Sequence, residues 1–456
     1  MARTTKNFTS DQRTTEGFFK MNDQPLEKIR KISWKELEQL KLERFQSTLN
    51  RVYQNVPFYH DRFKEFQLDP GDFASLEDIR YLPFTTRKDL SDNYPYGMFA
   101  VPLRDILRIH TSVGSGENPA VVGYTNRDLA NWKEIVGRCL LASEVSPNDI
   151  IQVVFDYGLA NWGRDFKDGT ELIEASIIPM SHLPSEKQLL VMRDYRTSVL
   201  VTTPSLALHL IYTLSFLEFD AEDLALKKCL LLGEQFDEDT RMRIEKGLGV
   251  KVWGAYGLSE VPGPGIAFEC RERCGFHASE DHFLFEIVDP ETGEPLPQGE
   301  FGELVITTIT TKAFPIIRFR TGDRARILND SCPCGLSLRR LEFLPERTDE
   351  VIVIRGVKVH PVQIASTIRK KLNGSNPAYV VFVSRDKYLE MIELWISVDD
   401  SLFSDKIKSL EMISETIKKE LQDILGIGVR VKLVEPPTLE PYREKLGKII
   451  DKDDSS

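Results

Sequence analysis

Residues 255–270 read AYGLSEVPGPGIAFEC, and this stretch places an aromatic ring, a hydroxyl and a carboxylate in one glycine-bounded turn. The run before it, GVKVWGAY (249–256), is rich in β-branched and aromatic residues and predicts a strand leading into the turn. Ligands bind where such strands end in α/β sheets. Tyr256 offers a flat face to a purine, Ser259 can donate to a phosphate oxygen, and Glu260 can hold Mg²⁺, which prefers carboxylate oxygen. An ordinary strand-to-loop turn would use the same residue types, so the motif alone leaves both interpretations open.

Length and composition limit the class of protein. A chain of 456 residues exceeds the roughly 250 to 300 residues at which single cores stop growing, so two or three domains are expected. A net charge of -11 argues against a general nucleic-acid binder and favours small ligands or protein partners. No window reaches the ~18 apolar residues of a membrane span, and residues 1–17 lack the apolar core of a secretory signal. We therefore expect a cytoplasmic chain without membrane attachment.

The cysteines indicate a metal site. Four of the six fall into two short clusters, Cys270-x3-Cys274-x2-His277 and Cys332-Pro-Cys334-Gly, while Cys139 and Cys229 stand alone in apolar surroundings. Thiolates and imidazole are the ligands that zinc takes in tetrahedral sites, and the tight CPCG turn holds two thiols on one side of a knuckle. The alternative is a set of buried thiols that never meet, because spacing does not prove that the clusters converge.

The chain reads as a large α/β domain followed by a smaller α+β domain. Residues 1–25 are expected to form a flexible tail, and the serine-capped SWKELEQLKLERFQSTLNRVYQ (33–54) predicts a long amphipathic helix. Between residues 100 and 310, apolar runs such as IIQVVF and CLLLG alternate with helical segments, which is the pattern of parallel βα units. LFEIVDP and ELVITTIT then predict an antiparallel hairpin.

The pattern changes near residue 349. VIVIRGVKVHP, IASTIRKK, AYVVFVS, MIELWISV, LEMISETIKKELQDIL and VRVKLVE follow in the order βαββαβ, which predicts a ferredoxin-like connection. Residues 436–456 are expected to form a mobile, lysine-rich tail. The predicted division is a tail at 1–25, a large domain at 26–348 and a small domain at 349–456.

Two further segments carry chemistry. Arg320-Thr-Gly-Asp323 places a carboxylate after a glycine at an expected strand end, where it can take both hydroxyls of a ribose. The alternative is an Asp in a type I turn or helix cap. The loop TSVGSGENP (111–119) is rich in glycine and hydroxyls, so its backbone amides could cradle phosphates, although a surface turn would look similar.

Taken together and in order, the segments resemble the adenylate-forming superfamily and, within it, the phenylacetate-CoA ligase family. The matching motifs run through nearly the whole chain: NVPFYHDRF (55–63), LPFTTRKDL, FAVP, FDYGLANWG, TTPSLALHL, GEQF, YGLSEVPGPG, DHFLFEI, RFRTGD and RTDEVIVIRGVKVHP. The resemblance implies an α/β fold with a large AMP-binding domain of βα sheets and a β subdomain, followed by a small mobile lid domain that carries a catalytic lysine.

The resemblance also implies a reaction. A carboxylate, here an aryl acid of the phenylacetate type, attacks the α-phosphate of ATP, and the thiol of coenzyme A then displaces AMP from the acyl-adenylate. ATP, Mg²⁺ and CoA are the implied cofactors and substrates, and a homodimer is a possible assembly. Two alternatives stay open: adenylyl transfer without CoA, to a deazaflavin coenzyme or a carrier protein, and a non-catalytic nucleotide-binding homologue.

The family's motifs assign roles to particular positions. Mg²⁺ falls to Glu260, the interdomain hinge to Asp349 and the CoA tunnel to Gly356. The catalytic lysine falls to Lys445, although an offset of three would select Lys448. Nucleotide contacts fall to Thr111, Ser112, Gly114, Ser115, Gly233, Glu234, Gln235, Ala255, Tyr256, Gly257, Ser259, Asp323 and Arg347. The acyl pocket falls to Tyr157, Gly158, Leu159, Trp162, Pro262 and Gly263, although Tyr157 and Trp162 could instead be plain core aromatics.

The chain departs from the family in the phosphate loop. The family reads SSGTTGKPT where this chain reads SVGSGENPA, so Glu117 replaces a glycine and Asn118 replaces a lysine. A carboxylate near phosphates raises the Coulomb energy and predicts weaker ATP binding or slower turnover. The metal site of the family, where present, joins the same two cysteine segments. It implies structural zinc on Cys270, His277, Cys332 and Cys334, with Cys274 as the substitute.

Overall fold

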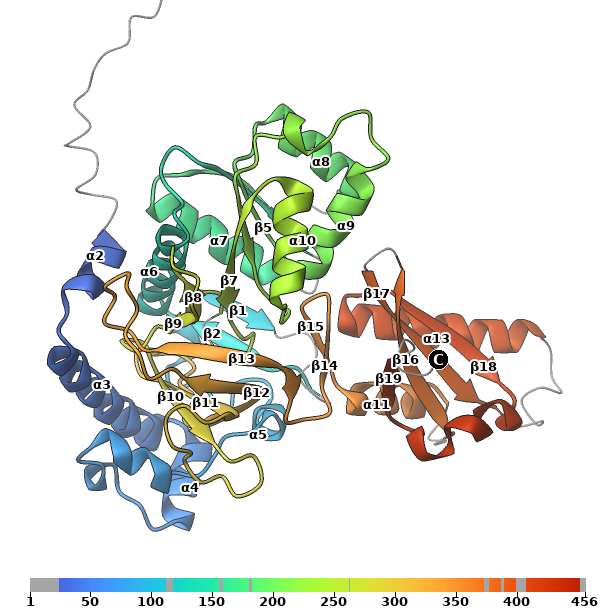
Figure 1. The fold of residues 1–456 in the computed structure, drawn as a ribbon. Coiled ribbons are helices and arrows are strands. Elements are labelled where there is room, and N and C mark those ends of the chain that lie inside the picture. The colour runs from blue at the N-terminus through green and yellow to red at the C-terminus, as the bar shows by residue number, and fades with distance from the viewer. Residues whose placement is uncertain are drawn as a thin grey trace, which may run out of the picture.

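The computed structural model describes residues 24–111, 118–155, 159–179, 183–261, 263–372, 377–386, 389–398 and 407–451. A large body holds the N-terminal helices and an 11-stranded sheet, and a small domain lies beside it (Figure 1). A short hairpin of the small domain, β14–β15, lies on the side that faces the large body. Most of the expected 1–25 tail falls outside the described residues, and its last two residues begin α2.

The N-terminal helices cover one side of the large body. They are α2 (Gln24–Lys31), α3 (Trp34–Asn55), α4 (Pro57–Glu65) and α5 (Arg87–Asp92). The predicted long helix is confirmed as α3, which begins with a capping box between Ser33 and Glu36. Thr86 caps α5 in the same way, through Asp89, and Arg87 is the first residue of that helix.

Parallel strands form one half of the large sheet, as predicted. The order β7-β6-β5-β3-β4 joins β3 (Ile150–Val154), β4 (Ser176–Ile178), β5 (Val199–Thr202), β6 (Lys228–Leu231) and β7 (Lys251–Tyr256). The helices of this part are α6 (Asn126–Ala142), α7 (Ala160–Leu172), α8 (Ser185–Asp194), α9 (Pro204–Leu214) and α10 (Glu238–Leu248). A separate pair, β1 (Arg108–Thr111) with β2 (Val121–Tyr124), flanks the phosphate-loop segment.

The other half of the sheet is antiparallel. It consists of β8 (Ala267–Glu269), β9 (Phe276–Ala278), β10 (Phe283–Val288), β11 (Gly302–Thr308), β12 (Phe319–Ile327) and β13 (Arg340–Arg347). The predicted hairpin is confirmed as β10–β11. Asp323 was expected at a strand end and instead lies inside β12, where the register with β13 shifts between Asp323 and Ala325. The β-bulge at this shift bends the strand and changes the direction of the Asp323 side chain. The carboxylate can therefore leave the regular alternation of the strand although Asp323 does not lie at its end.

Buried ion pairs tie the helices to this sheet. Arg138 of α6 is fully buried and donates to both carboxylate oxygens of Asp281, at 2.8 and 2.9 Å. Lys41 of α3 pairs with buried Glu280 at 3.1 Å. Within the described residues, no helix is both long and apolar enough to cross a bilayer.

The small domain differs from the ferredoxin-like prediction in one strand. It contains β14 (Ile352–Ile354), β15 (Val357–Val359), α11 (Pro361–Lys371), β16 (Tyr379–Asp386), β17 (Leu389–Ser397), α13 (Ile407–Leu425), β18 (Val429–Val434), η6 (Pro436–Lys445) and β19 (Ile449–Asp451). The four-stranded sheet runs β18-β17-β16-β19, whereas β14 and β15 pair only with each other. The first predicted strand is therefore a separate hairpin.

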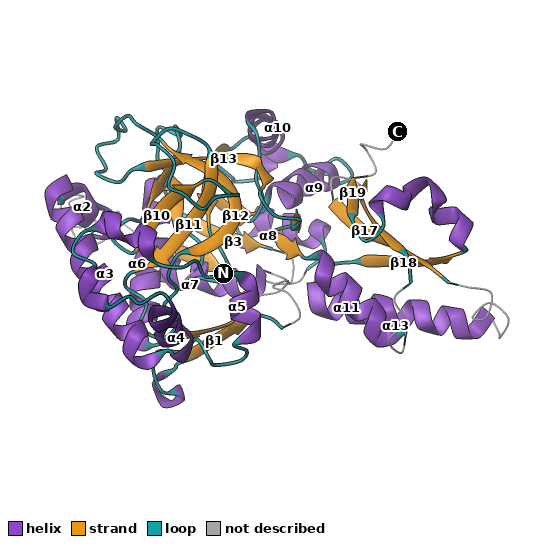
Figure 2. Cartoon of the chain, turned by 90° about the horizontal axis from the view of Figure 1, so that it is seen from below, coloured by secondary structure: helices purple, strands orange, loops and turns teal. Residues whose placement is uncertain are grey.

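The prediction of a mobile tail at residues 436–456 is wrong for most of that segment. β19 pairs in parallel with β16 and completes the sheet, and η6 packs on the sheet face opposite α11 and α13 (Figure 2). Leu439 and Ile450 are buried against Val380 and Phe382. These apolar residues, spaced among prolines and lysines, hold the segment in place although its composition is polar.

Candidate active site

Tyr256 and Asp323 meet at the junction of the two halves of the sheet. Tyr256 ends β7, and its hydroxyl donates to Asp323 Oδ2 at 2.6 Å. Its ring stacks on Phe343 of β13 with centroids 4.4 Å apart. Both Tyr256 and Asp323 are 8% exposed. The aromatic ring of Tyr256 and the carboxylate of Asp323 thus lie side by side where the parallel and antiparallel halves of the sheet meet.

A chain of charges leads from Asp323 to the hinge. The guanidinium of Arg347 pairs with Asp323 and, at 2.7 Å, with Asp349. Although burial opposes it, the pairing with Asp323 and Asp349 holds the pKa of Arg347 above its usual range. Gly322 has φ +75, and a Cβ there would lie 2.2 Å from the Asp349 carboxylate, so only glycine allows this approach. Asp349, the predicted hinge residue, is thus linked through Arg347 to Asp323, a predicted nucleotide-binding residue.

Glu260 is buried between two cations. Its Oε1 accepts from Arg87 Nε at 3.0 Å, and its Oε2 lies 3.9 Å from Lys358 Nζ. Arg87 also donates to Asp349 at 2.9 Å. The Glu260 side chain is 1% exposed, and those of Arg87 and Lys358 are each 13% exposed. One carboxylate of the large domain thus faces a lysine of the hairpin.

The surroundings shift the pKa of both partners. Burial alone would raise the pKa of Glu260, but the charges of Lys358 and Arg87 hold it below its usual range. Burial lowers the pKa of Lys358 to about 8, against the attraction of Glu260. Glu260 is therefore ionised at neutral pH, and Lys358 is mostly ionised.

Three cavities surround these residues. One of about 580 Å³ lies between the domains and is lined by Glu234, Gln235, Asp323, Arg347, Asp349 and Lys448, among others. A cavity of about 50 Å³ adjoins Gly233, Glu234, Gln235, Ala255, Tyr256, Gly257, Phe343 and Lys358. The structure thus brings the 233–235 segment, the Tyr256–Gly257–Leu258 part of the turn and Asp323 to one cavity. Burial raises the pKa of Glu234 to about 7, although its carboxylate accepts from Ser205 at 2.6 and 2.9 Å.

The hairpin turn reaches the expected acyl pocket. Gly356 has φ +79, which favours glycine, and a Cβ there would lie 2.5 Å from Leu159 Cδ1 and 3.3 Å from Thr203 Cγ2, so a larger residue would have to displace these side chains. A third cavity, of about 40 Å³, is lined by Leu159, Trp162, Gly233, Gly257, Leu258, Ser259, Gly356, Val357 and Lys358. Gly356 thus lies beside the acyl residues.

Only some of the residues expected to form the acyl pocket lie within the described part of the chain. Leu159 and Trp162 are buried, and a Cβ at Gly263 would lie 2.4 Å from Trp132 and 3.2 Å from Trp162. Tyr157, Gly158 and Pro262 lie outside the described residues. The described wall of the pocket is therefore apolar and aromatic, and it includes Trp132 of α6.

The phosphate loop lies largely outside the described residues. Ser112, Gly114, Ser115 and Glu117 fall there, and Thr111 is exposed at the end of β1. Asn118, which replaces the family's lysine, is bound to α5: its backbone N donates to Ser91 Oγ at 3.1 Å and its Nδ2 to the Ser91 carbonyl at 3.3 Å.

The two candidate lysines lie on the small domain. Both are exposed: Lys445 ends η6 and Lys448 lies in the turn before β19, where Lys448 N donates to the Lys445 carbonyl at 3.1 Å. Lys448 lines the interdomain cavity, and Lys445 does not. The structure therefore does not bring Lys445 to Glu260 or Asp323 in this domain arrangement.

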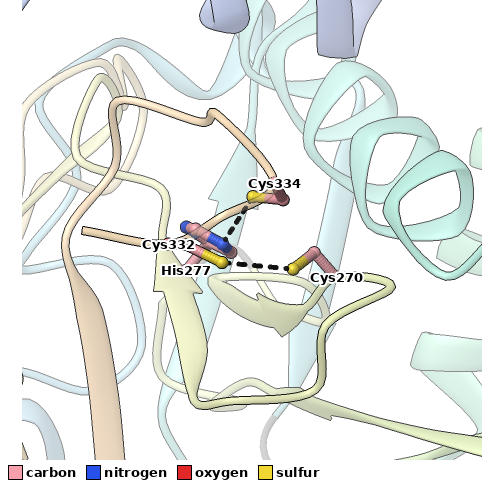
Figure 3. Close-up of side chains that lie close together, drawn as sticks. All are labelled: Cys270, His277, Cys332 and Cys334. Atoms are coloured by element: carbon pink, nitrogen blue, oxygen red, sulfur yellow. Dashed lines mark hydrogen bonds between the residues drawn. The ribbon is translucent and has the colours of Figure 1, made fainter. Parts of the chain in front are cut away.

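Four of the predicted metal ligands converge (Figure 3). The ligand atoms of Cys270, His277, Cys332 and Cys334 all lie within 4.8 Å of one another, and all four residues are buried. Cys270 Sγ and Cys332 Sγ are 3.7 Å apart, and Cys334 Sγ lies 3.3 Å from His277 Nε2. Two sulfurs each 2.3 Å from a tetrahedral zinc would be about 3.8 Å apart. The Cys270–Cys332 spacing matches this value, and the other ligand atoms, within 4.8 Å of one another, need shifts of about 1 Å or less to surround a zinc ion.

Neighbouring groups support this set. His277 Nδ1 lies 3.1 Å from the Leu338 carbonyl, which orients Nε2 toward the thiols. Cys274, the substitute ligand, is exposed; its Sγ lies 3.7 Å from Cys332 Sγ and accepts from Arg340 at 2.8 Å. Cys274 is thus adjacent to the four-residue set rather than part of it.

Arg87 and Lys358 were not predicted as site residues. Arg87 occupies the first position of α5, where the helix dipole disfavours a cation, and this local conflict was a usable signal. Lys358 lies between buried Val357 and Val359 in a short strand. From the sequence, this alternation would place Lys358 on the exposed face of a hairpin. Its contact with Glu260 depends on domain docking and has no local signal.

Comparison with known proteins identifies the class. The model of the AMP-binding enzyme family matches residues 173–311, and that of the AMP-binding enzyme C-terminal domain matches residues 356–453. A phenylacetate-coenzyme A ligase of Thermus thermophilus is 37% identical over 430 residues, which cover 91% of this chain and 96% of the relative. The chain belongs to the phenylacetate-CoA ligase family.

Solved structures show the same fold. A 2-hydroxyisobutyryl-CoA ligase, solved in complex with 2-HIB-AMP and CoA in the thioesterification state, superposes with a TM-score of 0.83 at 23% identity, covering 93% of this chain and 91% of that chain. The same ligase in the postadenylation state with R3-HIB-AMP gives a TM-score of 0.66 at 22% identity, covering 94% and 92%.

Proposed function

We propose that the protein is an AMP-forming ligase that joins an aryl carboxylic acid of the phenylacetate type to coenzyme A. A carboxylate oxygen of the acid attacks the α-phosphorus of ATP and pyrophosphate leaves. The sulfur of CoA then attacks the carbonyl carbon, its proton is released, and AMP leaves with the bridging oxygen. The observation that carries the proposal is the contact of Tyr256 with Asp323, which ion pairs through Arg347, Asp349 and Arg87 connect to Glu260, in a chain that belongs to this family.

The nucleotide would be held by groups already oriented. Tyr256 and Phe343 offer aromatic surface to adenine, and the Asp323 carboxylate is positioned by Arg347 to accept from the ribose hydroxyls. The 233–235 segment lines the same cavity and suits the adenine edge. Apolar Leu159, Trp132 and Trp162 suit an aromatic acid.

The arrangement of the two domains supports assigning this structure to the second step of the reaction, thioester formation. Gly356 lies against Leu159 in the acyl pocket, and Lys445 is absent from the interdomain cavity. The better superposition on the thioesterification-state ligase supports the same assignment. The first step then requires the small domain to rotate about Asp349 and present Lys445 to the α-phosphate.

The proposal is tested by the products. The protein is incubated with ATP, Mg²⁺, CoA and separate aryl and aliphatic acids, and the nucleotides and thioesters are separated by chromatography. AMP and an aryl-CoA thioester are expected in equal amounts, and only with CoA present. AMP release without CoA would favour adenylyl transfer to another acceptor, and ADP as the product would contradict the proposal.

Asp323 provides a second test. Replacing it with alanine removes an acceptor for two ribose hydroxyls, so KM for ATP is expected to rise about 10- to 100-fold, as for hydrogen bonds to a charged group. The Asp323→Asn variant preserves the side-chain shape and should give a smaller rise. Steady-state kinetics check this, with thermal unfolding as the control for folding. An unchanged KM for ATP in both variants would exclude the ribose role.

The cysteine cluster is proposed to bind structural zinc. Cys270, His277, Cys332 and Cys334 supply four ligands, which complete a tetrahedral shell and leave no open position for a substrate. The ion would hold the β8–β9 segment to the loop before β13. Its role would therefore be architectural, because β8 pairs with β7, which carries Tyr256, and β9 pairs with β13, which carries Phe343.

A further inference from the structure

Glu260, the expected magnesium ligand, has no room for a hydrated ion in this arrangement. Its Oε1 is bound by Arg87 at 3.0 Å, and its Oε2 accepts from Ser259 Oγ at 3.2 Å and faces Lys358 at 3.9 Å. Mg²⁺ requires near-octahedral geometry at roughly 2.0–2.1 Å and retains several waters. That shell would occupy the space of the Lys358 ammonium.

Glu260 is the group that compensates the burial of the Lys358 ammonium. The Nζ of Lys358 is inaccessible and has no hydrogen-bond partner among the described residues. Buried ammonium groups are costly unless paired with an opposite charge. The local charges balance with Lys358 in place, because Arg87, Arg347 and Lys358 face Glu260, Asp323 and Asp349. A divalent ion added to this set would leave it with excess positive charge.

We propose that Lys358 replaces Mg²⁺ as the counter-charge of Glu260, so that one carboxylate binds the metal in one domain orientation and the β14–β15 hairpin in the other. Metal and hairpin then exclude each other. Once free of a metal ion, Glu260 would attract Lys358, and docking of the hairpin would bring Gly356 against Leu159. Lys358 is a positioning residue, and this role rests on the proposed two-step reaction.

The test measures docking directly. Amide hydrogen–deuterium exchange is followed in residues 257–259 and 352–359 of the full chain, without nucleotide or metal. In Lys358→Met these amides should exchange about ten-fold faster than in the wild type, since the hairpin opens more often. Lys358→Arg should retain protection, and Lys432→Met, at an exposed lysine of the same domain, should match the wild type. Thermal unfolding identifies variants that fail to fold.

A double-mutant cycle separates the ion pair from general packing. If Lys358 and Glu260 act together, Glu260→Gln with Lys358→Met should open the hairpin no more than either single change. Mg²⁺ with a non-hydrolysable ATP analogue should speed exchange in the wild type and have little further effect in Lys358→Met. Unchanged exchange in Lys358→Met, or additive effects in the cycle, would overturn the inference. These measurements need neither acid nor CoA, so their failure is distinguishable from loss of ligase activity.

Discussion

Replacing Lys445 with alanine is expected to slow acyl-adenylate formation by about 10²- to 10³-fold, the usual cost of removing one group that stabilises transition-state charge. Negative charge grows on the α-phosphate as the carboxylate attacks, and an exposed lysine on a rotating domain can reach it. Thioester formation from added acyl-adenylate and CoA should change little, because Lys445 is absent from the cavity between the docked domains. Single-turnover measurement of each half-reaction checks both expectations.

Lys448→Ala is the matched control for Lys445. Both lysines are exposed, and both lie in the turn that β19 anchors to β16. A small effect of Lys448→Ala on adenylation, beside a large one of Lys445→Ala, is the predicted result. The reverse order would assign the catalytic role to Lys448, which already lines the interdomain cavity.

Replacing Cys332 with serine is expected to remove bound zinc and lower the unfolding temperature by about 10 °C. Cys332 Sγ lies 3.7 Å from Cys270 Sγ, and loss of one thiolate leaves a three-ligand site. The wild type should contain one zinc per chain by elemental analysis, and chelators should reproduce the destabilisation.

Cys274→Ser is the control for the zinc site. Its thiol is exposed and lies beside the set, so zinc content should stay near one per chain. Loss of zinc in this variant would make Cys274 a ligand. A wild type without zinc, together with an unchanged unfolding temperature in Cys332→Ser, would contradict the proposed metal site.

Local patterns predicted the large domain well. Alternating apolar runs and capped helices gave the parallel strands and α3, because both depend on short-range periodicity. The small domain was harder to predict: VIVIRGVKVHP has strand composition, but its partner strand lies within the same segment. The tail from 436 was expected to be mobile because its few buried residues, such as Leu439, are separated by polar ones.

The same distinction applies to the site. Tyr256 and Asp323 were singled out because each lies in a recognisable motif, and Cys270 and Cys332 because thiols in tight turns are distinctive; the structure brings the members of each pair into contact. Arg87 and Lys358 were missed, since their contacts with Glu260 join segments far apart in the sequence and, for Lys358, two domains. Sequence motifs reveal the groups expected to bind ligands, but they rarely reveal the charged groups that pair with those residues in the folded protein.

In the proposed reaction the carboxylate of the acid attacks the α-phosphorus of ATP. This step is tested most directly with an acid whose two carboxylate oxygens are ¹⁸O, incubated with ATP, Mg²⁺ and CoA, followed by mass spectrometry of the nucleotide product. One ¹⁸O in each AMP formed is the predicted result, because AMP leaves with the bridging oxygen. Unlabelled AMP, or ¹⁸O in inorganic phosphate together with ADP, would contradict the account.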